Sequence, residues 1–160
     1  MHIRAYLSST KIGETDPLCN WKEQFMAKVN AMECFIGDND VSMTFIDPFM
    51  FYAPKNTAVV EADINNLDIC NVIICCISTV TIGTMMELAY SAFMYPDRQK
   101  RIIISTNPTV LNHPWMKNLT REKPYGSLGK ATLCNTIDEA VMALARFVTQ
   151  AKEEQNKQET

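Results

Sequence analysis

NVIICCIS, at residues 71–78, is the stretch that decides the fold class of this chain. Its six central residues, 72–77, are all apolar. The central strand of a parallel sheet is buried on both faces, so it carries apolar side chains at successive positions rather than at alternate ones. We therefore expect residues 71–78 to form the middle strand of a parallel sheet.

Strand patterns alternate with helical patterns on both sides of this stretch. We expect four further strands, at residues 2–8, 42–47, 101–105 and 131–135. Helices are expected from Asp16, from about residue 57 to 67, from 84 to about 95, and from Thr136 onward. This alternation predicts an α/β protein with helices on both faces of the sheet.

Local signals mark the ends of these helices. Asp16 and Pro17 suit an N-cap and a first helical position. The apolar residues that follow recur at helical spacing: Leu18, Trp21, Phe25, Val29 and Met32. Thr136 and Glu139 predict a capping box for the last helix. In that helix Val141, Leu144 and Val148 should face inward, and the polar residues 152–160 are expected to fray. In the second helix Val60, Ile64 and Leu67 should share one side.

Length and charge limit the function classes. The chain has 160 residues, of which 47% are hydrophobic, so we expect one domain over residues 1–160. Its 15 basic and 18 acidic residues give a net charge of -3 and form no basic stripe, which argues against a nucleic-acid polymer as partner. The longest apolar run is too short to span a bilayer, and no secretion signal is visible, so we expect a cytoplasmic protein without a membrane partner.

The six cysteines predict free thiols in the core rather than a disulfide framework. Cys75 and Cys76 fall inside the central strand, where successive side chains face opposite ways. No Cys-x-x-Cys pair occurs, and the only histidines are His2 and His113. We therefore predict no structural or catalytic metal. The reaction that we expect below also uses no cofactor.

Two loop regions are candidates for contact with a ligand. Residues 48–54 contain Phe49 and Phe51, which could stack on a nucleobase or pack in the core. Residues 106–130 show little periodicity, so we expect a long surface excursion that could cover a site.

The segment IGTMMELA, at residues 82–89, is the best candidate for chemistry. We expect it to follow the central strand and to open onto the crevice at the carboxyl ends of the strands, where ligands bind in open parallel sheets. Gly83 would allow close backbone approach. Glu87 would lie in the first helical turn, where the helix dipole favours its ionised, nucleophilic form. Ordinary helix-start chemistry is the alternative.

Three pieces of sequence, taken together, resemble the nucleoside 2-deoxyribosyltransferase family. They are AYLSS at residues 5–9, EADINNLDICNV at residues 61–72, and the Gly-Thr-x-x-Glu-Leu-Ala turn at residues 83–89. Their order and spacing agree with the family over about the first two-thirds of the chain. The resemblance implies a three-layer, flavodoxin-like fold with a five-stranded parallel sheet.

The resemblance also implies roles for three residues. Glu87 would be the nucleophile that forms a deoxyribosyl ester. Tyr6 would orient the Glu87 carboxylate, and Asp63 would exchange a proton with the base, as the acid does in retaining glycosidases. Core packing for Tyr6 and a solvated helix face for Asp63 are the alternatives.

Substrate-binding residues follow from the same comparison. Ser8, Gly83 and Thr84 lie in the matching pieces. Thr81 stands where the family usually carries an aspartate that contacts the sugar, so this contact should be weaker or the preferred sugar different. Asn112 is the candidate for the sugar's 5′ end, an asparagine that some family members supply from a neighbouring subunit. A homo-oligomer is therefore expected.

The expected function is cleavage of the N-glycosidic bond of 2′-deoxynucleosides, with transfer of the sugar to another base. The expected partners are a small deoxynucleoside or deoxynucleotide and a free base. A hydrolase acting on deoxynucleoside 5′-monophosphates is one alternative, for which Ser105, Thr106 and Ser127 are possible phosphate donors. The other alternative is a binding module that holds a nucleotide without turnover.

Overall fold

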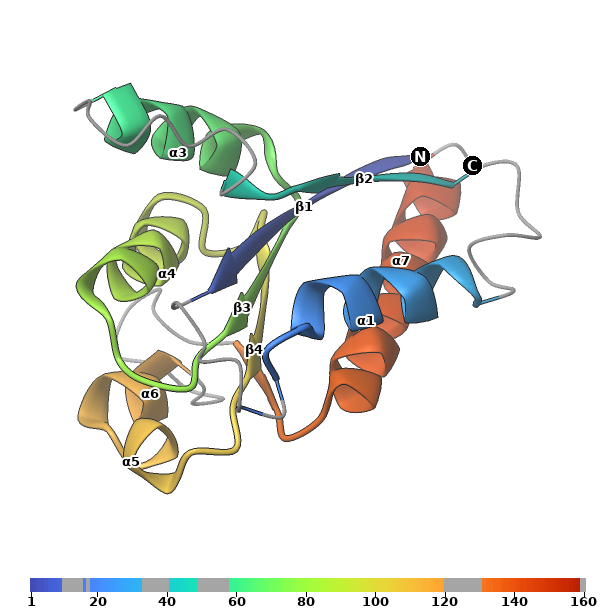
Figure 1. Ribbon diagram of the computed structural model, residues 1–160. Coiled ribbons are helices and arrows are strands. Elements are labelled where there is room, and N and C mark those ends of the chain that lie inside the picture. Colours follow the sequence, from blue (N-terminus) through green and yellow to red (C-terminus); the bar gives the residue numbers. More distant parts are fainter. Residues whose placement is uncertain (10–15, 17, 33–40, 49–57, 120–130, 159–160) are drawn as a thin grey trace.

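The computed structural model describes residues 1–9, 16, 18–32, 41–48, 58–119 and 131–158. Five parallel strands form one sheet in the order β2-β1-β3-β4-β5, which is the flavodoxin-like order (Figure 1). The strands are β1 (His2–Ser9), β2 (Ser42–Ile46), β3 (Val72–Cys76), β4 (Lys100–Ile104) and β5 (Thr132–Cys134). The three-layer α/β fold expected from the sequence is confirmed.

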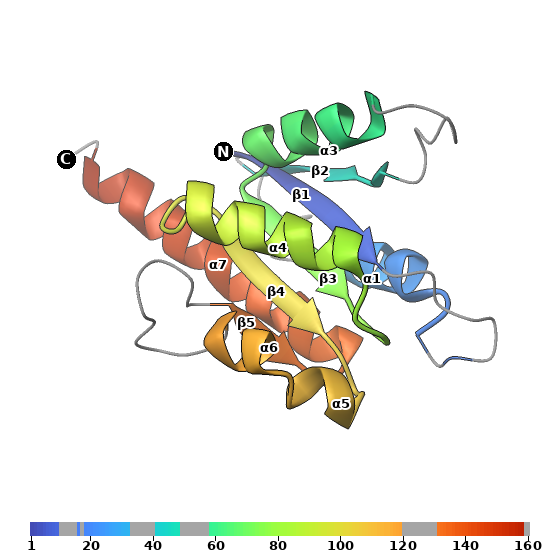
Figure 2. The same cartoon turned by 90° about the vertical axis from the view of Figure 1, so that its left-hand side faces the viewer.

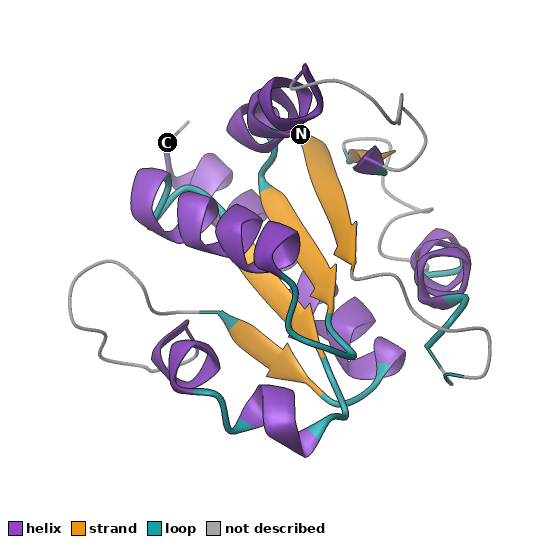
Figure 3. Ribbon diagram, turned by 60° about the vertical axis from the view of Figure 1, so that its left-hand side comes forward, coloured by secondary structure: helices purple, strands orange, loops and turns teal. Residues whose placement is uncertain are grey.

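Helices cover both faces of this sheet. On one face α1 (Trp21–Asn30) and α7 (Ile137–Gln158) pack against the strands. The other face carries α3 (Ala58–Ile69), α4 (Ile82–Met94), α5 (Pro108–Leu111) and α6 (Pro114–Leu119). Figure 2 views the face with α4 in front of the strands, and Figure 3 shows the sheet between its two helical layers.

The central strand β3 supplies both hydrophobic cores. Val72, Ile74 and Cys76 belong to the core beneath α1 and α7, whereas Ile73 and Cys75 belong to the core beneath α4. All five residues are buried, as the apolar run predicts. The five cysteines within the described residues are free thiols, and four of them are buried; Cys19, which is exposed, departs from the expected core position.

Several helix boundaries differ from the sequence-based expectations. Asn20 rather than Asp16 is the N-cap of α1, and the Asp16 carboxylate instead accepts a hydrogen bond from the Leu18 N–H at 2.8 Å, in a turn before the helix. Pro17 lies outside the described residues. In α3, Leu67 is buried but Val60 is 62% exposed, so the side that these residues share with Ile64 meets the core only toward the end of the helix.

The C-terminal third of the chain is more helical than its sequence suggested. The segment expected to be an irregular excursion contains α5 and α6, which bury Val110, Met116 and Leu119. The last helix does not fray at residue 152 but continues to Gln158. Its capping box is confirmed in part: the Glu139 N–H donates to Thr136 Oγ1 at 3.1 Å, but the Glu139 carboxylate accepts from the N–H of Asn135, one residue before the N-cap, at 2.6 Å.

Candidate active site

The strand order places the topological switch point of the sheet between β1 and β3. The chain leaves β1 to form β2 on one side and returns to form β3 on the other, which makes this pair the topological switch point of the sheet. In open parallel sheets ligands bind outside the carboxyl ends of the strands at such a point. Tyr6 and Ser8 of β1 pair with Ile73 and Cys75 of β3. Tyr6 and Ser8 are two residues apart on one strand, so their side chains lie on the same face of the sheet. This face is covered by α4.

Glu87 of α4 meets both of these side chains. The Tyr6 hydroxyl donates a hydrogen bond to Glu87 Oε1 at 3.0 Å, and the Ser8 hydroxyl donates to Glu87 Oε2. Tyr6 and Ser8 are buried, while Glu87 is half-buried. Both carboxylate oxygens are therefore oriented by hydroxyl groups that the sheet holds in place, toward the carboxyl end of β1.

The electrostatics of Glu87 correct one expectation. Because α4 begins at Ile82, Glu87 lies in its second turn, and the influence of a helix dipole is concentrated in the first. Burial is the dominant effect and raises the pKa of Glu87. Hydrogen bonds from Ser8 and Tyr6 lower this pKa in part, so the two hydroxyls, rather than the helix end, favour the carboxylate form.

Asp63 approaches the same group from α3. It is half-buried, and burial raises the pKa of its carboxyl group, while a hydrogen bond with Tyr6 lowers that pKa in part. The pKa of Tyr6 is raised far above its usual value by burial and by the negative charges of Glu87 and Asp63. Tyr6 therefore stays protonated at neutral pH, and its one hydroxyl proton is donated to Glu87.

The start of α4 differs from the predicted loop. Thr81 is the N-cap residue, but its hydroxyl makes no capping bond to the backbone and instead donates to Thr84 Oγ1 at 3.3 Å. Thr84 is buried and Gly83 is exposed in the first turn. A Cβ atom added to Gly83 would meet no protein atom within 4 Å, so the backbone there is open on that side.

The other predicted binding residues do not join this cluster. Asn112 is the exposed C-cap residue of α5. Ser105, a possible phosphate donor for the alternative hydrolase, is buried, and its hydroxyl donates to the Ile77 carbonyl at 2.7 Å. Thr106 is exposed. Phe49, Phe51 and Ser127 lie outside the described residues.

Lys22 is a charged residue near the site that sequence reasoning missed. It is buried on α1, forms an ion pair with Asp47 at 2.6 Å, and lowers the pKa of Glu87 by its positive charge. Lys22 and Glu87 are 65 residues apart in sequence, so only the three-dimensional fold brings them near each other. In the sequence, Lys22 is one polar residue of an amphipathic helical pattern that includes Trp21. No sequence motif could have found it.

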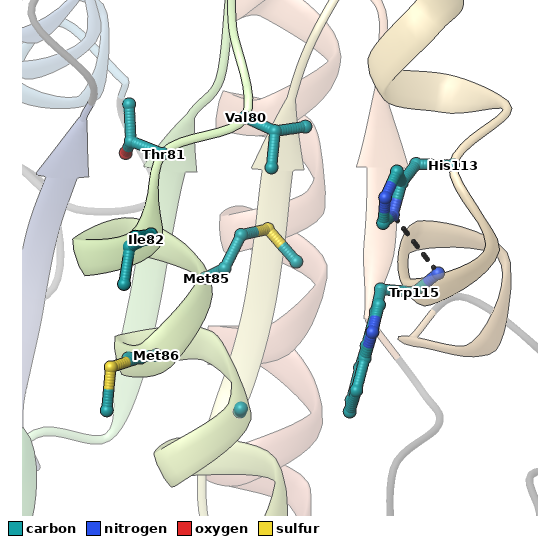
Figure 4. Close-up of a pocket in the computed structure, with 8 residues that line it drawn as sticks. Val80, Thr81, Ile82, Met85, Met86, His113 and Trp115 are labelled. Carbon is teal, nitrogen blue, oxygen red and sulfur yellow. Dashed lines mark hydrogen bonds between the residues drawn. The ribbon is translucent and has the colours of Figure 1, made fainter.

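A separate cavity of about 400 Å³ lies between α4 and the α5–α6 connection (Figure 4). Its lining is mostly apolar and comprises Val80, Thr81, Ile82, Met85, Met86, Ala89, His113 and Trp115. The His113 ring accepts a hydrogen bond from the Trp115 N–H at 3.3 Å. Tyr6, Asp63 and Glu87 do not line this cavity, so it is distinct from the carboxylate cluster.

Comparisons of the chain with protein-family models, curated proteins and solved structures give no match. Within the described residues, no group of three or more histidine, cysteine, aspartate or glutamate side chains could hold a metal ion. No helix in the same part of the chain has the length and apolar character needed to cross a bilayer.

Proposed function

We propose that this protein cleaves the N-glycosidic bond of 2′-deoxynucleosides and transfers the sugar to another base through a deoxyribosyl ester of Glu87. The observation that carries the proposal is the pair of hydroxyl groups, from Tyr6 and Ser8, that orient the Glu87 carboxylate at the β1/β3 switch point. A carboxylate held at a ligand crevice by fixed donors is suited to attack carbon. The sequence resemblance to nucleoside 2-deoxyribosyltransferases supplies the substrate class.

In the first step one oxygen of Glu87 attacks the anomeric carbon of the deoxyribose. The carbon–nitrogen bond breaks, and its electron pair passes to the leaving base, which receives a proton from Asp63. Burial raises the pKa of Asp63, which supports its carrying that proton.

In the second step a nitrogen of the incoming base attacks the same carbon, and the ester bond to Glu87 breaks. Asp63, now ionised, takes the proton from the incoming base. Negative charge returns to Glu87 in this step, and the Tyr6 and Ser8 hydroxyls stabilise it through charge-assisted hydrogen bonds. Tyr6 keeps its own proton throughout, because its pKa is raised far above neutrality.

Thr81 favours a second candidate function, that of a nucleotide-binding module without turnover. Its hydroxyl donates to Thr84 and leaves no acid at the position where the resembling family contacts the sugar. The hydrolase on 5′-monophosphates is less well supported, because the Ser105 hydroxyl already donates to Ile77.

Incubation with a panel of deoxynucleosides and free bases, followed by chromatography, tests these proposals. A transferase forms a new nucleoside only when a second base is present, whereas a hydrolase releases free sugar or sugar phosphate without one. Including deoxynucleoside 5′-monophosphates in the panel separates the two substrate classes. Binding of panel members without any product would favour the binding module.

A further inference from the structure

The C-terminal end of α3 is tied to α4 by one carboxylate. Asp68 Oδ1 accepts hydrogen bonds from the hydroxyls of Tyr90 and Tyr95, each at 2.8 Å. The two tyrosine rings meet edge to face, with their centroids 6.2 Å apart. Arg98 donates to the Asp68 backbone carbonyl and stacks over the Tyr95 ring, 4.0 Å from its centroid. These contacts make a connected group, which we call the tyrosine clamp: Asp68, Tyr90, Tyr95 and Arg98.

A buried glutamine completes the attachment from the inner side. Gln99 Nε2 donates to the carbonyls of Leu67 and Cys70, the latter at 3.0 Å. The last carbonyls of a helix have no partner within the helix, so donors from elsewhere fix both its end and its direction. The end of α3 is therefore defined by residues of α4 and of the segment after it.

The clamp lies close to the carboxylate cluster along both helices. Asp63 precedes Asp68 by five residues, or about 7 Å along the helix axis, and Glu87 precedes Tyr90 by less than one turn. Figure 2 shows α3 and α4 side by side with their C-terminal ends at the same side of the molecule. A change at the clamp therefore alters the spacing between the helix of Asp63 and the helix of Glu87.

The start of α3 offers less burial than its end. Leu67 and Cys70 are buried in the core, whereas Val60, Glu61 and Ala62 are exposed. Asp63 lies between these two parts, half-buried and close enough to the Tyr6 hydroxyl for each group to influence the pKa of the other. Its place near the Tyr6 hydroxyl depends on how firmly the end of α3 is held.

We infer that Asp68, Tyr90 and Tyr95 are positioning residues, which hold Asp63 against Tyr6 and beside Glu87. The catalytic part of this inference rests on the proposed function, but the placement of Asp63 does not. With the clamp released, Asp63 becomes more solvated and loses contact with the Tyr6 hydroxyl. Burial is the larger influence on Asp63, so release lowers the pKa of its carboxyl group toward the ordinary value for aspartate.

Two different variants release the hydroxyl–carboxylate bonds of the clamp, while the backbone contacts of Arg98 and Gln99 stay in place. Asp68→Ala removes the acceptor, and the double variant Tyr90→Phe with Tyr95→Phe removes both donors while keeping the rings and the Asp68 charge. Asp68→Asn keeps an acceptor oxygen and should preserve the clamp. Asp138→Ala is the matched control, because Asp138 also ties two helices, through an ion pair with Lys28 at 2.6 Å on the opposite face of the sheet.

The measurement is the pKa of Asp63, followed by carboxyl carbon NMR on the full chain without ligand and assigned with Asp63→Asn. We expect it to fall in both releasing variants and to stay at the wild-type value in Asp68→Asn and Asp138→Ala. With a deoxynucleoside substrate, kcat should fall about tenfold in the releasing variants with KM little changed, as for a misplaced catalytic group.

An unchanged Asp63 pKa in both releasing variants, with the fold intact by circular dichroism, would overturn the inference. A fall in Asp138→Ala as large as in Asp68→Ala would also overturn it, since general loosening of the helices would then be the cause. If the wild-type protein turns over no deoxynucleoside, the proposed function fails, while the ligand-free titration still decides whether the clamp positions Asp63.

Discussion

Glu87 is the residue on which the proposed chemistry depends. Its two carboxylate oxygens accept hydrogen bonds from Tyr6 and Ser8. Glutamine at this position can still accept the bond from Tyr6 through its amide oxygen, and its amide nitrogen can lie beside the Ser8 hydroxyl. Glutamine cannot form the ester. We expect Glu87→Gln to reduce the steady-state rate of base exchange at least a thousandfold, since loss of a covalent route costs several kcal/mol. A variant that retains more than about a tenth of the wild-type rate would exclude Glu87 as nucleophile.

The same substitution should make the protein more stable at neutral pH. Burial raises the pKa of Glu87 in the folded protein above its value in the unfolded chain. Protonated Glu87 therefore adds to the free energy of unfolding below the unfolded pKa, and this contribution is lost as the pH rises through the folded pKa. Glutamine does not ionise and escapes this loss. Thermal denaturation should give a higher Tm for Glu87→Gln than for wild type at pH 7, with the difference vanishing at acidic pH. Glu23→Gln, at an exposed position of α1, controls for removal of one negative charge.

Ser8 allows a test of what keeps Glu87 ionised. The hydrogen bond from Ser8 lowers the pKa of Glu87, so Ser8→Ala should raise it. Activity that needs the carboxylate is lost as pH falls through this pKa, and the acidic limb of the kcat/KM profile should therefore move to higher pH. Ser42→Ala, on the edge strand β2, is the control and should leave the limb in place. A limb that does not move in Ser8→Ala would assign it to another group.

The helices on the two faces of the sheet differ in whether they carry residues of the proposed site. α3 and α4 carry Asp63 and Glu87, whereas α1 and α7 cover the opposite face and form the other core. The ends of α7 and α3 are stabilised by different devices, a capping box and the tyrosine clamp. Changes at α7 should therefore affect stability without affecting the proposed site.

Thr136→Ala tests this separation. Loss of an N-cap hydroxyl costs about 1 kcal/mol of stability, and this cap serves the longest described helix. Urea denaturation should show a lower midpoint with an unchanged slope, and kcat per folded molecule should equal that of wild type. Thr149→Ala is the matched control, because its hydroxyl donates within α7 to the Ala145 carbonyl on an exposed surface, so its removal should change the midpoint little. A loss of kcat in Thr136→Ala would show that the two faces are coupled.

For the whole molecule, the sequence predicted the sheet better than it predicted the surroundings of the site. Every strand was expected from local patterns. The pattern of β3 was the clearest, because a strand that is buried on both faces has apolar residues at successive positions. The helices α5 and α6 were missed, since four and six residues are too few for helical periodicity to emerge.

The meeting of Tyr6, Ser8 and Glu87 was expected in part, but its electrostatics were not. The resemblance to nucleoside 2-deoxyribosyltransferases implied that Tyr6 and Glu87 are partners. The raised pKa of Glu87 and the influence of Lys22 arise from burial and from contacts between distant segments, which one sequence does not display. The tyrosine clamp was likewise hidden, because Asp68 and Tyr90 lie 22 residues apart.

The last prediction concerns the complete protein and separates an enzyme from a binding module. A deoxynucleoside analogue with fluorine at the 2′ position in the arabino configuration destabilises the cation-like transition states of both steps. With an activated leaving base, the first step outruns the second, and the sugar remains esterified to Glu87. Intact-protein mass spectrometry after denaturation should show the mass of one added fluorinated sugar, and peptide mapping should place it between Thr84 and Leu88.

Glu87→Gln is the control for this trapping and should show no added mass, whereas Asp63→Asn should still be labelled, because an activated base leaves without a proton from Asp63. Label on another residue would reassign the nucleophile. If calorimetry shows that the wild-type protein binds the analogue and no mass is added, the carboxylate at the crevice serves to recognise a nucleoside rather than to cleave it.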